Sequence, residues 1–221
     1  MKLVVFTAVI GPNTDPLYPV SPEGMVQYLC FTDQHVTAPG WEIRQLPMQP
    51  HRETVYKARE LKIRAHETLA AEDPDVSLWV DAAYELRVDP RGVADQWLWR
   101  ADAVAFPHPD RATMEEEGKA LVHLGRVERH LITAQVDRFH ATKLRQRSRL
   151  TSTGYLLRRH CGRVRDFNAI WWDLFRQGGH PRDQMTVDWA AAATGTDIRH
   201  LAGHYRDNAY AHWHKHTPAK R

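Results

Sequence analysis

The chain has 221 residues, of which 43% are hydrophobic, and it carries a net charge of +3 at pH 7. A chain of this length and composition can bury a full core as one domain. Its two cysteines, Cys30 and Cys161, lack CxxC spacing, which excludes a disulfide framework and a cysteine-built metal site and favours a reducing compartment. No run approaches the roughly eighteen apolar residues of a membrane span, so we expect a cytoplasmic protein without one.

Strands and helices alternate in the first part of the chain. Residues 3–10 are apolar but lack a small-residue cleavage site, so they predict a first strand rather than a signal peptide. The polar loop at 11–16 follows, at the strand end where a nucleotide usually lies. Residues 28–33 and 41–46 predict two further strands, and 55–71 has the periodicity of a helix.

The next strand is the centre of the predicted sheet. Residues 76–80 are short, apolar and uncharged, which is typical of a buried parallel strand, and the run stops at the carboxylate of Asp81. Ligands of open α/β sheets bind at the carboxyl ends of strands, so Asp81 stands where a ligand would be met. A lone Asp at a strand end is nevertheless more often a turn-former or a helix cap.

The second part of the chain is more helical. Its predicted elements are a short segment at 85–88, a helix at 93–99, a strand at 103–106, a helix opened by the capping box Thr113 to Glu116, a helix at 128–144, a strand at 153–158, a helix at 164–174 and a helix from Gln184 to Gly195. The pattern predicts the α/β class, with a mostly parallel sheet flanked by helices in a single domain, 1–221. Residues 206–221 have the composition of a His- and Lys-rich tail.

Several polar side chains follow buried strands and are expected at one edge of this sheet, namely Asp33, Asp81, His108 and Arg111. A strand-end Asp can hold a divalent cation, and such a cation is a usual partner of a diphosphate. Sugar transfer from a nucleotide sugar needs this arrangement, because the leaving diphosphate accumulates negative charge. The chain has no GxGxxG and no Walker lysine motif, which disfavours Rossmann dehydrogenases and P-loop enzymes.

Taken together, blocks in a fixed order resemble the glycosyltransferase-like family long known as a domain of unknown function, with plant members implicated in mucilage and pectin synthesis and many bacterial and phage members. The blocks are Phe31-Thr32-Asp33, Trp41-Glu42-Ile43-Arg44, Lys57-Ala58-Arg59 with Lys62, Leu78-Trp79-Val80-Asp81-Ala82, His108-Pro109-Asp110-Arg111 with Glu116-Glu117, Leu157-Arg158-Arg159-His160, Trp171-Trp172 and Arg182-Asp183-Gln184. The resemblance covers about residues 3–193. It implies a GT-A-like fold, with a nucleotide-sugar half at about 1–110 and an acceptor half at about 111–205.

The resemblance also implies a metal site for Mn²⁺ or Mg²⁺. Asp81 would take the place of the family's Asp-x-Asp motif, whose second acid is replaced here by Ala83. A histidine near the carboxyl terminus, His204 or His214, would complete the site. The alternatives are a His-rich tail that holds no metal, and a fold that survives without activity.

The same resemblance assigns the donor contacts. Asp33 would accept hydrogen bonds from the base, Arg59 and Lys62 would face the diphosphate, and His108 and Arg111 would touch the sugar or the phosphates. Thr7 and Gln184 complete the predicted nucleotide-sugar site. Asp183 would act near the reacting carbon, as the general base of an inverting reaction or as an electrostatic stabiliser of a retaining one. Turn caps, a helix cap and a solvated helix face are the plain alternatives for these residues.

The distribution of charge along the chain suggests a second possible function. Between Arg126 and Arg165 there are eleven Lys or Arg and two acids, a local net charge of +9. Such a segment suggests an anionic partner or a solvated face. The protein could therefore be a nucleic-acid-binding module, or a glycosyltransferase acting on modified DNA bases, while an unidentified glycan is the acceptor in the first reading.

Overall fold

The computed structural model describes residues 1–12, 17–22, 26–50, 53–146 and 148–214. Its main sheet has seven strands in the order β3-β2-β1-β4-β7-β6-β8. The strands are β1 (Leu3–Val9), β2 (Val26–Thr32), β3 (Glu42–Gln45), β4 (Val76–Val80), β6 (Ala103–Pro107), β7 (Thr151–Arg159) and β8 (Ile198–His200). Only β7 runs antiparallel to its neighbours, β4 and β6, so the predicted α/β class with a mostly parallel sheet is confirmed.

Strand β7 is inserted, antiparallel, into the middle of the sheet. It comes from the predicted acceptor half, yet it lies between β4 and β6 of the predicted nucleotide half, so the two halves share one sheet. Because β7 is antiparallel, its amino end lies at the same edge as the carboxyl ends of β1, β2, β4 and β6. Side chains from the start of β7 therefore meet side chains that follow β4.

The helices are α1 (Thr54–Ile63), α2 (Ala65–Thr68), α3 (Pro90–Trp97), η1 (Leu98–Arg100), α4 (Met114–His123), α5 (Arg129–Ala141), α6 (Gly162–Gly178) and α7 (Gln184–Thr194). The predicted helix 55–71 differs from the structure, because the backbone of Arg64, at φ −88° and ψ 41°, interrupts it between α1 and α2. Half of the predicted capping box is present, since Thr113 Oγ1 accepts from Glu116 N. The Glu116 carboxylate accepts from Ala112 N.

A second, two-stranded sheet pairs β5 (Tyr84–Leu86) with β9 (Ala211–Trp213). Part of the predicted His- and Lys-rich tail is thus an ordered strand rather than a loose end. Residues 215–221 of that tail, residues 13–16 of the predicted nucleotide loop, and Arg147 of the basic segment lie outside the described residues.

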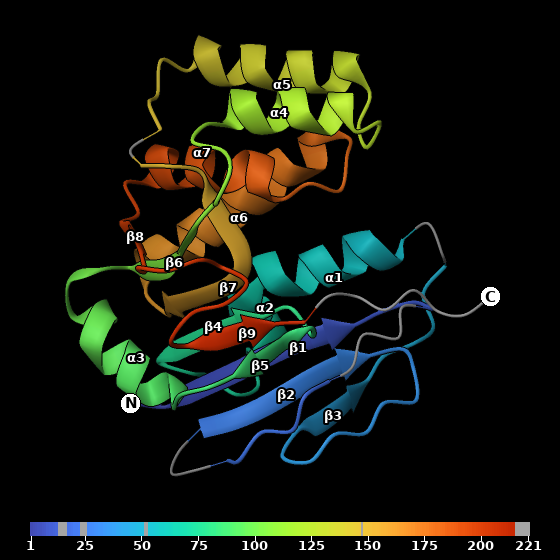
Figure 1. Cartoon of the computed structure of the whole chain (residues 1–221), viewed down its shortest axis with the longest axis vertical. Coiled ribbons are helices and arrows are strands. Elements are labelled where there is room, and N and C mark those ends of the chain that lie inside the picture. Colours follow the sequence, from blue (N-terminus) through green and yellow to red (C-terminus); the bar gives the residue numbers. More distant parts are fainter. Residues whose placement is uncertain (13–16, 23–25, 51–52, 147, 215–221) are drawn as a thin grey trace.

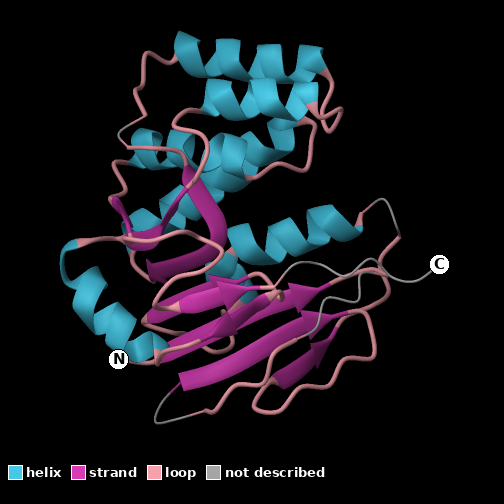
Figure 2. Cartoon of the chain, in the orientation of Figure 1, coloured by secondary structure: helices cyan, strands magenta, loops and turns pink. Residues whose placement is uncertain are grey.

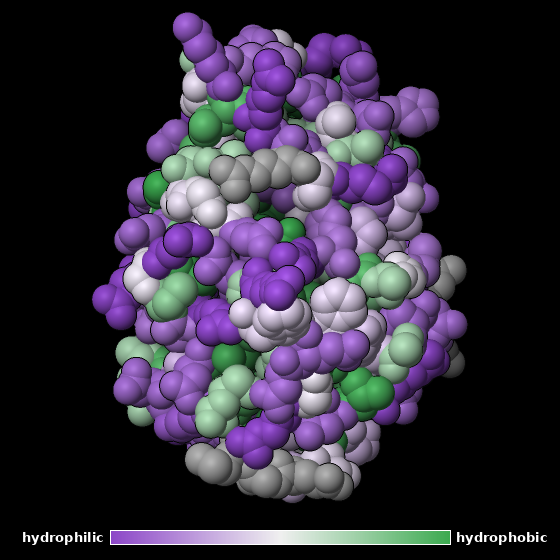
Figure 3. Space-filling model, turned by 90° about the vertical axis from the view of Figure 1, so that its left-hand side faces the viewer, coloured by the Kyte–Doolittle hydropathy of each residue, from purple (hydrophilic) through white to green (hydrophobic). Residues whose placement is uncertain are grey.

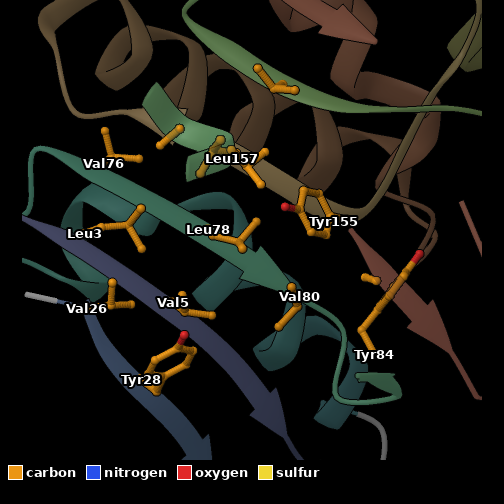
Figure 4. Packing of buried hydrophobic residues seen from close by; sticks show 14 of the residues in the cluster. Leu3, Val5, Val26, Tyr28, Val76, Leu78, Val80, Tyr84, Tyr155 and Leu157 are labelled. Carbon is orange, nitrogen blue, oxygen red and sulfur yellow. The ribbon is translucent and has the colours of Figure 1, made fainter. Parts of the chain in front are cut away.

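Each face of the main sheet carries its own core, as the alternation of side chains along a strand requires. Leu3, Val5, Leu78 and Val80 point to the face covered by α3 and the β5–β9 pair. Figure 4 shows this layer, with Val80 at the tip of β4 and Tyr84 just beyond it. The other face, with Phe6 and Trp79, packs against α1, α6 and α7.

Helices α4 and α5 form an outer layer. They lie on α6 and α7, away from the sheet (Figures 1 and 2). A third cluster of buried side chains, which includes Leu121, Ile132, Phe139, Met185 and Trp189, holds this layer in place.

The side of the molecule that carries α3 and β8 is mostly hydrophilic, with hydrophobic residues in small separate patches (Figure 3). In the part of the chain that is described, none of the helices combines the length and hydrophobicity needed to cross a membrane. Cys30 is buried, Cys161 is exposed, and neither is in a disulfide.

Candidate active site

Asp81 is fixed at the tip of β4 by two hydrogen bonds. Its backbone N–H donates to Gly154 O of β7 at 2.8 Å, and the Trp79 indole N–H donates to its Oδ1, also at 2.8 Å. A Cβ added to Gly154 would lie 2.9 Å from Asp81 Oδ2 and 3.1 Å from Tyr84 Cε2. Glycine is therefore required where β7 passes the carboxylate, which is a usual reason for glycine inside a strand. The Asp81 side chain remains 37% exposed.

A buried ion network lies beside Asp81. Lys62, on α1, is 1% exposed, and its Nζ lies 2.5 Å from Asp183 Oδ2 and 3.9 Å from Asp81 Oδ1. The Nζ also donates to Thr153 O and Oγ1, at 3.2 Å each. Arg59, one helical turn earlier, places its Nε 3.1 Å from Asp183 Oδ1. The network joins α1, the start of β7 and the start of α7.

The side chain of Asp183 does not cap α7, although the residue stands at the N-cap position. Its Oδ2 accepts from Thr153 Oγ1 at 2.9 Å, and its backbone carbonyl accepts from the Trp171 indole. Burial by itself would raise the pKa of Asp183, but the charges of Arg59 and Lys62 and the hydrogen bonds from Lys62 and Thr153 outweigh burial and lower the pKa well below its ordinary value. Asp183 is consequently held as a carboxylate.

For Lys62, burial outweighs the attraction of the neighbouring charges. Burial and the like charge of Arg59 lower the pKa of its ammonium group, and attraction to Asp183 and Asp81 offsets only part of that effect. An isolated charge at this depth would be costly, so the carboxylate of Asp183 is what makes Lys62 tolerable here.

A cavity of about 220 Å³ opens between the ends of β1 and β4 and the first turns of α1. Its lining consists of Ala8, Val9, Ile10, Thr54, Val55, Ala58, Arg59, Trp79, Asp81 and Ala82. Two of the predicted site residues, Arg59 and Asp81, thus face the same space. Lys62 and Asp183 lie behind this wall.

Asp33 ends β2, as predicted, and its carboxylate turns inward. Its Oδ1 accepts from Gly11 N at 2.8 Å and its Oδ2 from Gln49 N at 3.0 Å, so it joins the loops after β1 and β3. Burial opposes ionisation of Asp33, but hydrogen bonds from Gln34, Gly11 and Gln49 lower its pKa. Gly11, at φ +81°, approaches Thr54 so closely that a Cβ would lie 2.8 Å from its Cγ2. Contact of Asp33 with a base remains a prediction.

Two further residues predicted to contact the donor, Thr7 and Gln184, are not among the residues that line the cavity. Thr7 is fully buried inside β1, and its Oγ1 has no hydrogen-bond partner among the described residues. Gln184 is the first residue of α7 and is half-buried. Both stay predictions.

His108 and Arg111 follow β6, one strand beyond β7 from Asp81, and neither lines the cavity. Arg111 Nη1 lies 3.1 Å from Oε2 of the buried Glu117, on α4, and 3.0 Å from His108 Nε2. Burial and the neighbouring charge of Arg111 lower the pKa of His108 to about 4. His108 is therefore neutral at pH 7, and this pair belongs with α4 rather than with the Asp81 carboxylate.

Of the residues predicted to bind a metal ion, only Asp81 lines the cavity. Within the described residues no three His, Cys, Asp or Glu side chains are grouped as a metal site. Strand β9 brings His214 next to Ala83, since His214 N donates to Ala83 O at 2.8 Å, while its Nε2 lies 2.9 Å from Glu85 Oε2. His204 is exposed, and its Nδ1 accepts from Arg206 N.

The basic segment Arg126 to Arg165 does not form one continuous face. Arg158 is fully buried and donates to Lys62 O at 2.7 Å. Arg159 donates to Leu98 O and Ala101 O, and Arg163 pairs with Asp102. These three arginines hold β7 and α6 in place, so the charge count overstates the surface offered to a nucleic acid.

Sequence reasoning missed several members of the site. The sequence predicts Trp79 and Thr153 only as strand residues, although Trp79, two positions before Asp81, shares its face by strand periodicity. Gly154 carried a signal, because a glycine inside a predicted strand often marks a close approach of another group. Thr153 had no such signal, since only the pairing of β7 with β4 brings it to Lys62.

Comparisons with known proteins give a family match. A model of the TOD1/MUCI70, glycosyltransferase-like domain matches residues 29–203. Among solved structures, the chain is similar to residues 1–349 of S. aureus TarS in complex with UDP, at 12% sequence identity and a TM-score of 0.45. That similarity covers 96% of this chain and 60% of the TarS chain, so this chain spans less than two thirds of its length. No curated protein matches the chain significantly.

Proposed function

The chain belongs to the TOD1/MUCI70 glycosyltransferase-like domain family, and we propose that it is a GT-A-type glycosyltransferase that moves a sugar from a UDP-sugar to an acceptor. One observation carries the proposal: Asp81 and Arg59 line the same cavity at the edge of the sheet where α/β proteins bind nucleotides. The cavity, at about 220 Å³, is smaller than the roughly 300–1,000 Å³ of common ligand pockets; we assign it to the diphosphate.

Arg59 is the group that would meet the leaving diphosphate. Its side chain is 23% exposed and lines the cavity, whereas Lys62 is buried behind it. A guanidinium can bind two phosphate oxygens at once, and it stabilises the charge that develops on the leaving group. Lys62 and Asp183 then act as positioning residues, because Asp183 holds the Arg59 side chain at 3.1 Å and is itself held by Lys62.

Asp183 is a poor candidate for the general base. A base works best when its pKa is close to the working pH, whereas the pKa of Asp183 is lowered well below its ordinary value. Of the two roles predicted from sequence, electrostatic stabilisation fits this environment better. We therefore propose that Asp183 fixes Arg59 and Lys62 and does not accept the proton of the acceptor.

A divalent cation, Mn²⁺ or Mg²⁺, is a further part of the proposal. Hard cations at phosphate sites commonly use one or two protein carboxylates, with substrate phosphates and water as the other ligands. A single exposed carboxylate, Asp81, fits that pattern, and His214 lies close to the loop that follows it. The cation would supply positive charge to the diphosphate, while Trp79 fixes the orientation of the Asp81 carboxylate through Oδ1.

The remaining donor contacts follow from their positions. We propose Asp33 and Thr7 for the nucleotide end of the donor and Gln184 for the sugar end, next to Asp183. His108 and Arg111 lie on the side of α4, which favours the acceptor over the donor diphosphate. A cytoplasmic location, expected from the two unpaired cysteines, also stays a prediction.

Thermal-shift measurements with UDP-, GDP- and CMP-sugars, each with and without Mn²⁺, test the proposal. A UDP-sugar should raise the melting temperature of the wild-type protein, because a ligand that binds only the folded state stabilises it. The shift should be larger with Mn²⁺, and donor hydrolysis should fall at least about a hundredfold in Asp81→Asn if the cation contributes a few kcal/mol. Asp95→Asn, an exposed charge change on α3, is the matched control. If no nucleotide sugar shifts the transition, the donor assignment is wrong.

A further inference from the structure

Helices α4 and α5 leave an open groove between them, at the end of the molecule that lies away from the sheet (Figure 1). Its volume is about 520 Å³, and one face of each helix lines it, at positions that recur every three and four residues. The apolar part of this lining is Gly118, Val122, Ile132 and Val136, of which the two valines are only half-buried. We call this hollow the α4–α5 groove. Its shape and apolar anchors suit the docking of further helices.

The charged residues of the α4–α5 groove are segregated along its length. The two helices are antiparallel, because Glu115 at the start of α4 lies 2.8 Å from His140 near the end of α5. Glu115 and Asp137 therefore line one end of the groove, and His123 and Arg129 line the other. Among the described residues, neither Asp137 nor Arg129 has an ion-pair partner within 4.0 Å. One end of the groove is thus acidic and the other basic.

The charges are also spaced evenly about the middle of each helix. On α5, Arg129 and Asp137 stand four residues before and after Thr133, which lines the centre of the groove. On α4, Glu115 and His123 stand in the same relation to the centre of their helix face. A copy of the groove turned end to end would therefore bring Asp137 opposite Arg129 and Glu115 opposite His123, each pair occurring twice.

Two two-fold arrangements could lay the groove on a second copy of itself. If the axis runs along the groove, α4 meets α5 of the other copy and the acidic ends coincide. If the axis crosses the groove, each helix meets its own copy in antiparallel orientation and the acidic end of one copy meets the basic end of the other. Charge complementarity selects the second arrangement. It brings Lys119 close to its own copy, but a lysine side chain is long enough to turn to Glu115, one helical turn away on the other copy.

We propose that the α4–α5 groove is a two-fold interface between two copies of this chain. Its apolar residues meet across the axis, and its charged ends pair around them. Two helices that are about 20 Å long and together about 20 Å wide offer roughly 400 Å² per copy. That is about half of the roughly 800 Å² per partner in an interface of standard size, so the dimer belongs to the weak, dissociating class. The inference goes beyond the proposed function, because the groove shares no residue with the Asp81 cavity.

Sedimentation velocity on the full chain tests for the dimer. Protein concentrations should span roughly 5–500 μM, since a weak interface of this size dissociates in that range. The weight-average mass should rise with concentration from that of the 25.6 kDa chain toward twice that value.

Charge reversals locate the interface. Asp137→Arg and Arg129→Asp should each weaken association at least about tenfold, because like charges then meet twice in each dimer. Both positions are exposed, and an Asp at the start of α5 or an Arg toward its end suits the helix dipole, so neither change should unfold the helix. Asp95→Arg, at an exposed position on α3, makes the same change of charge as Asp137→Arg and should leave association unchanged. Melting temperatures show that each variant is folded.

A mixture of the two single variants gives the decisive measurement. The Arg129→Asp copy presents two acids where the Asp137→Arg copy presents two arginines, so the mixture should form a heterodimer although each variant alone associates weakly. The double variant Arg129→Asp with Asp137→Arg should likewise regain association. If the axis ran along the groove instead, Asp137→Arg would meet Glu115 and associate more tightly than the wild type.

Four results would overturn the inference. They are a wild-type chain that stays monomeric over the whole range, equal weakening in Asp95→Arg, tighter association of Asp137→Arg alone, and a mixture without a heterodimer. A monomeric wild type would leave the groove to a helix of a different protein. Persistent association with no effect of the charge reversals would place the contact on another face. Failure of nucleotide sugars to bind would overturn the proposed function and leave each of these readouts unchanged.

Discussion

At the scale of single residues, the contact between Gly154 and Asp81 offers the sharpest test. In Gly154→Ala the new methyl group would lie 2.9 Å from Asp81 Oδ2, so the carboxylate must rotate away from the Trp79 indole. We expect donor turnover to fall at least about tenfold and the free energy of unfolding by about 1–3 kcal/mol. Gly92→Ala on α3 is the matched control, because nothing lies within 4 Å of its added Cβ. Unchanged turnover in Gly154→Ala would contradict the role given to Asp81.

The Lys62–Asp183 pair makes a second prediction at this scale. Asp183→Asn leaves the buried ammonium of Lys62 without its carboxylate, which should cost about 3–5 kcal/mol in urea denaturation. The double variant Lys62→Met with Asp183→Asn should regain part of that loss, since it removes the stranded charge. Asp173→Asn, an exposed position on α6, controls for the loss of one acid. Equal stability of Asp183→Asn and Asp173→Asn would show that the pair does not stabilise the fold.

At the scale of elements, α7 is tied to β7 and β8 by a chain of hydrogen bonds. Thr151 N donates to Asp188 Oδ2 at 2.9 Å, Thr151 Oγ1 donates to Asp188 Oδ1, and the same hydroxyl lies 3.0 Å from His200 Nε2. Burial raises the pKa of Asp188 from 3.8 to about 6, although its two hydrogen bonds with Thr151 work in the opposite direction. This carboxyl group is therefore protonated more readily in the folded chain than in the unfolded one.

The sign of the pH dependence follows from that shift. The folded chain holds the extra proton between about pH 4 and pH 6, so the contribution of Asp188 to stability is full below pH 4 and is lost as the pH rises through 6. The difference in free energy of unfolding between wild type and Asp188→Asn should fall by up to about 3 kcal/mol over this range. His108, His160 and His180, whose pKa values are lowered to about 4, add the opposite trend to both proteins. A difference that does not change with pH would contradict the shift at Asp188.

The elements also show what could be predicted from sequence. Apolar runs that end on Asp33 and Asp81 located two strand ends correctly, because burial and side-chain alternation are local properties. The insertion of β7 between β4 and β6 could not be predicted from sequence. Strand β7 pairs with β4, which lies more than seventy residues earlier, and such a pairing leaves no local signal. For the same reason Lys62 was expected at the diphosphate, whereas its partner Asp183, 121 residues later, holds it inside.

At the scale of the whole molecule, the outer helical layer should open before the sheet does. Helix α5 buries only Ile132, Gln135 and Phe139, whereas every residue of β4 is buried. Hydrogen exchange followed by mass spectrometry should therefore show protection factors in α5 at least about a hundredfold lower than in β4. Helix α6, which packs directly on the sheet, is the internal comparison and should exchange slowly. Equal protection of α5 and α6 would mean that the layers unfold as one unit.

The place of β7 in the sheet also sets an order for synthesis on the ribosome. When translation has reached Pro107, β4 and β6 are both complete, yet the strand that must separate them has not been made. Once these strands have left the exit tunnel, the edges of β4 and β6 that will flank β7 are unpaired, and such edges invite pairing with other chains. They are closed only after β7, which ends at Arg159, has left the exit tunnel, so final assembly of the nucleotide edge waits for a strand made well after β4 and β6.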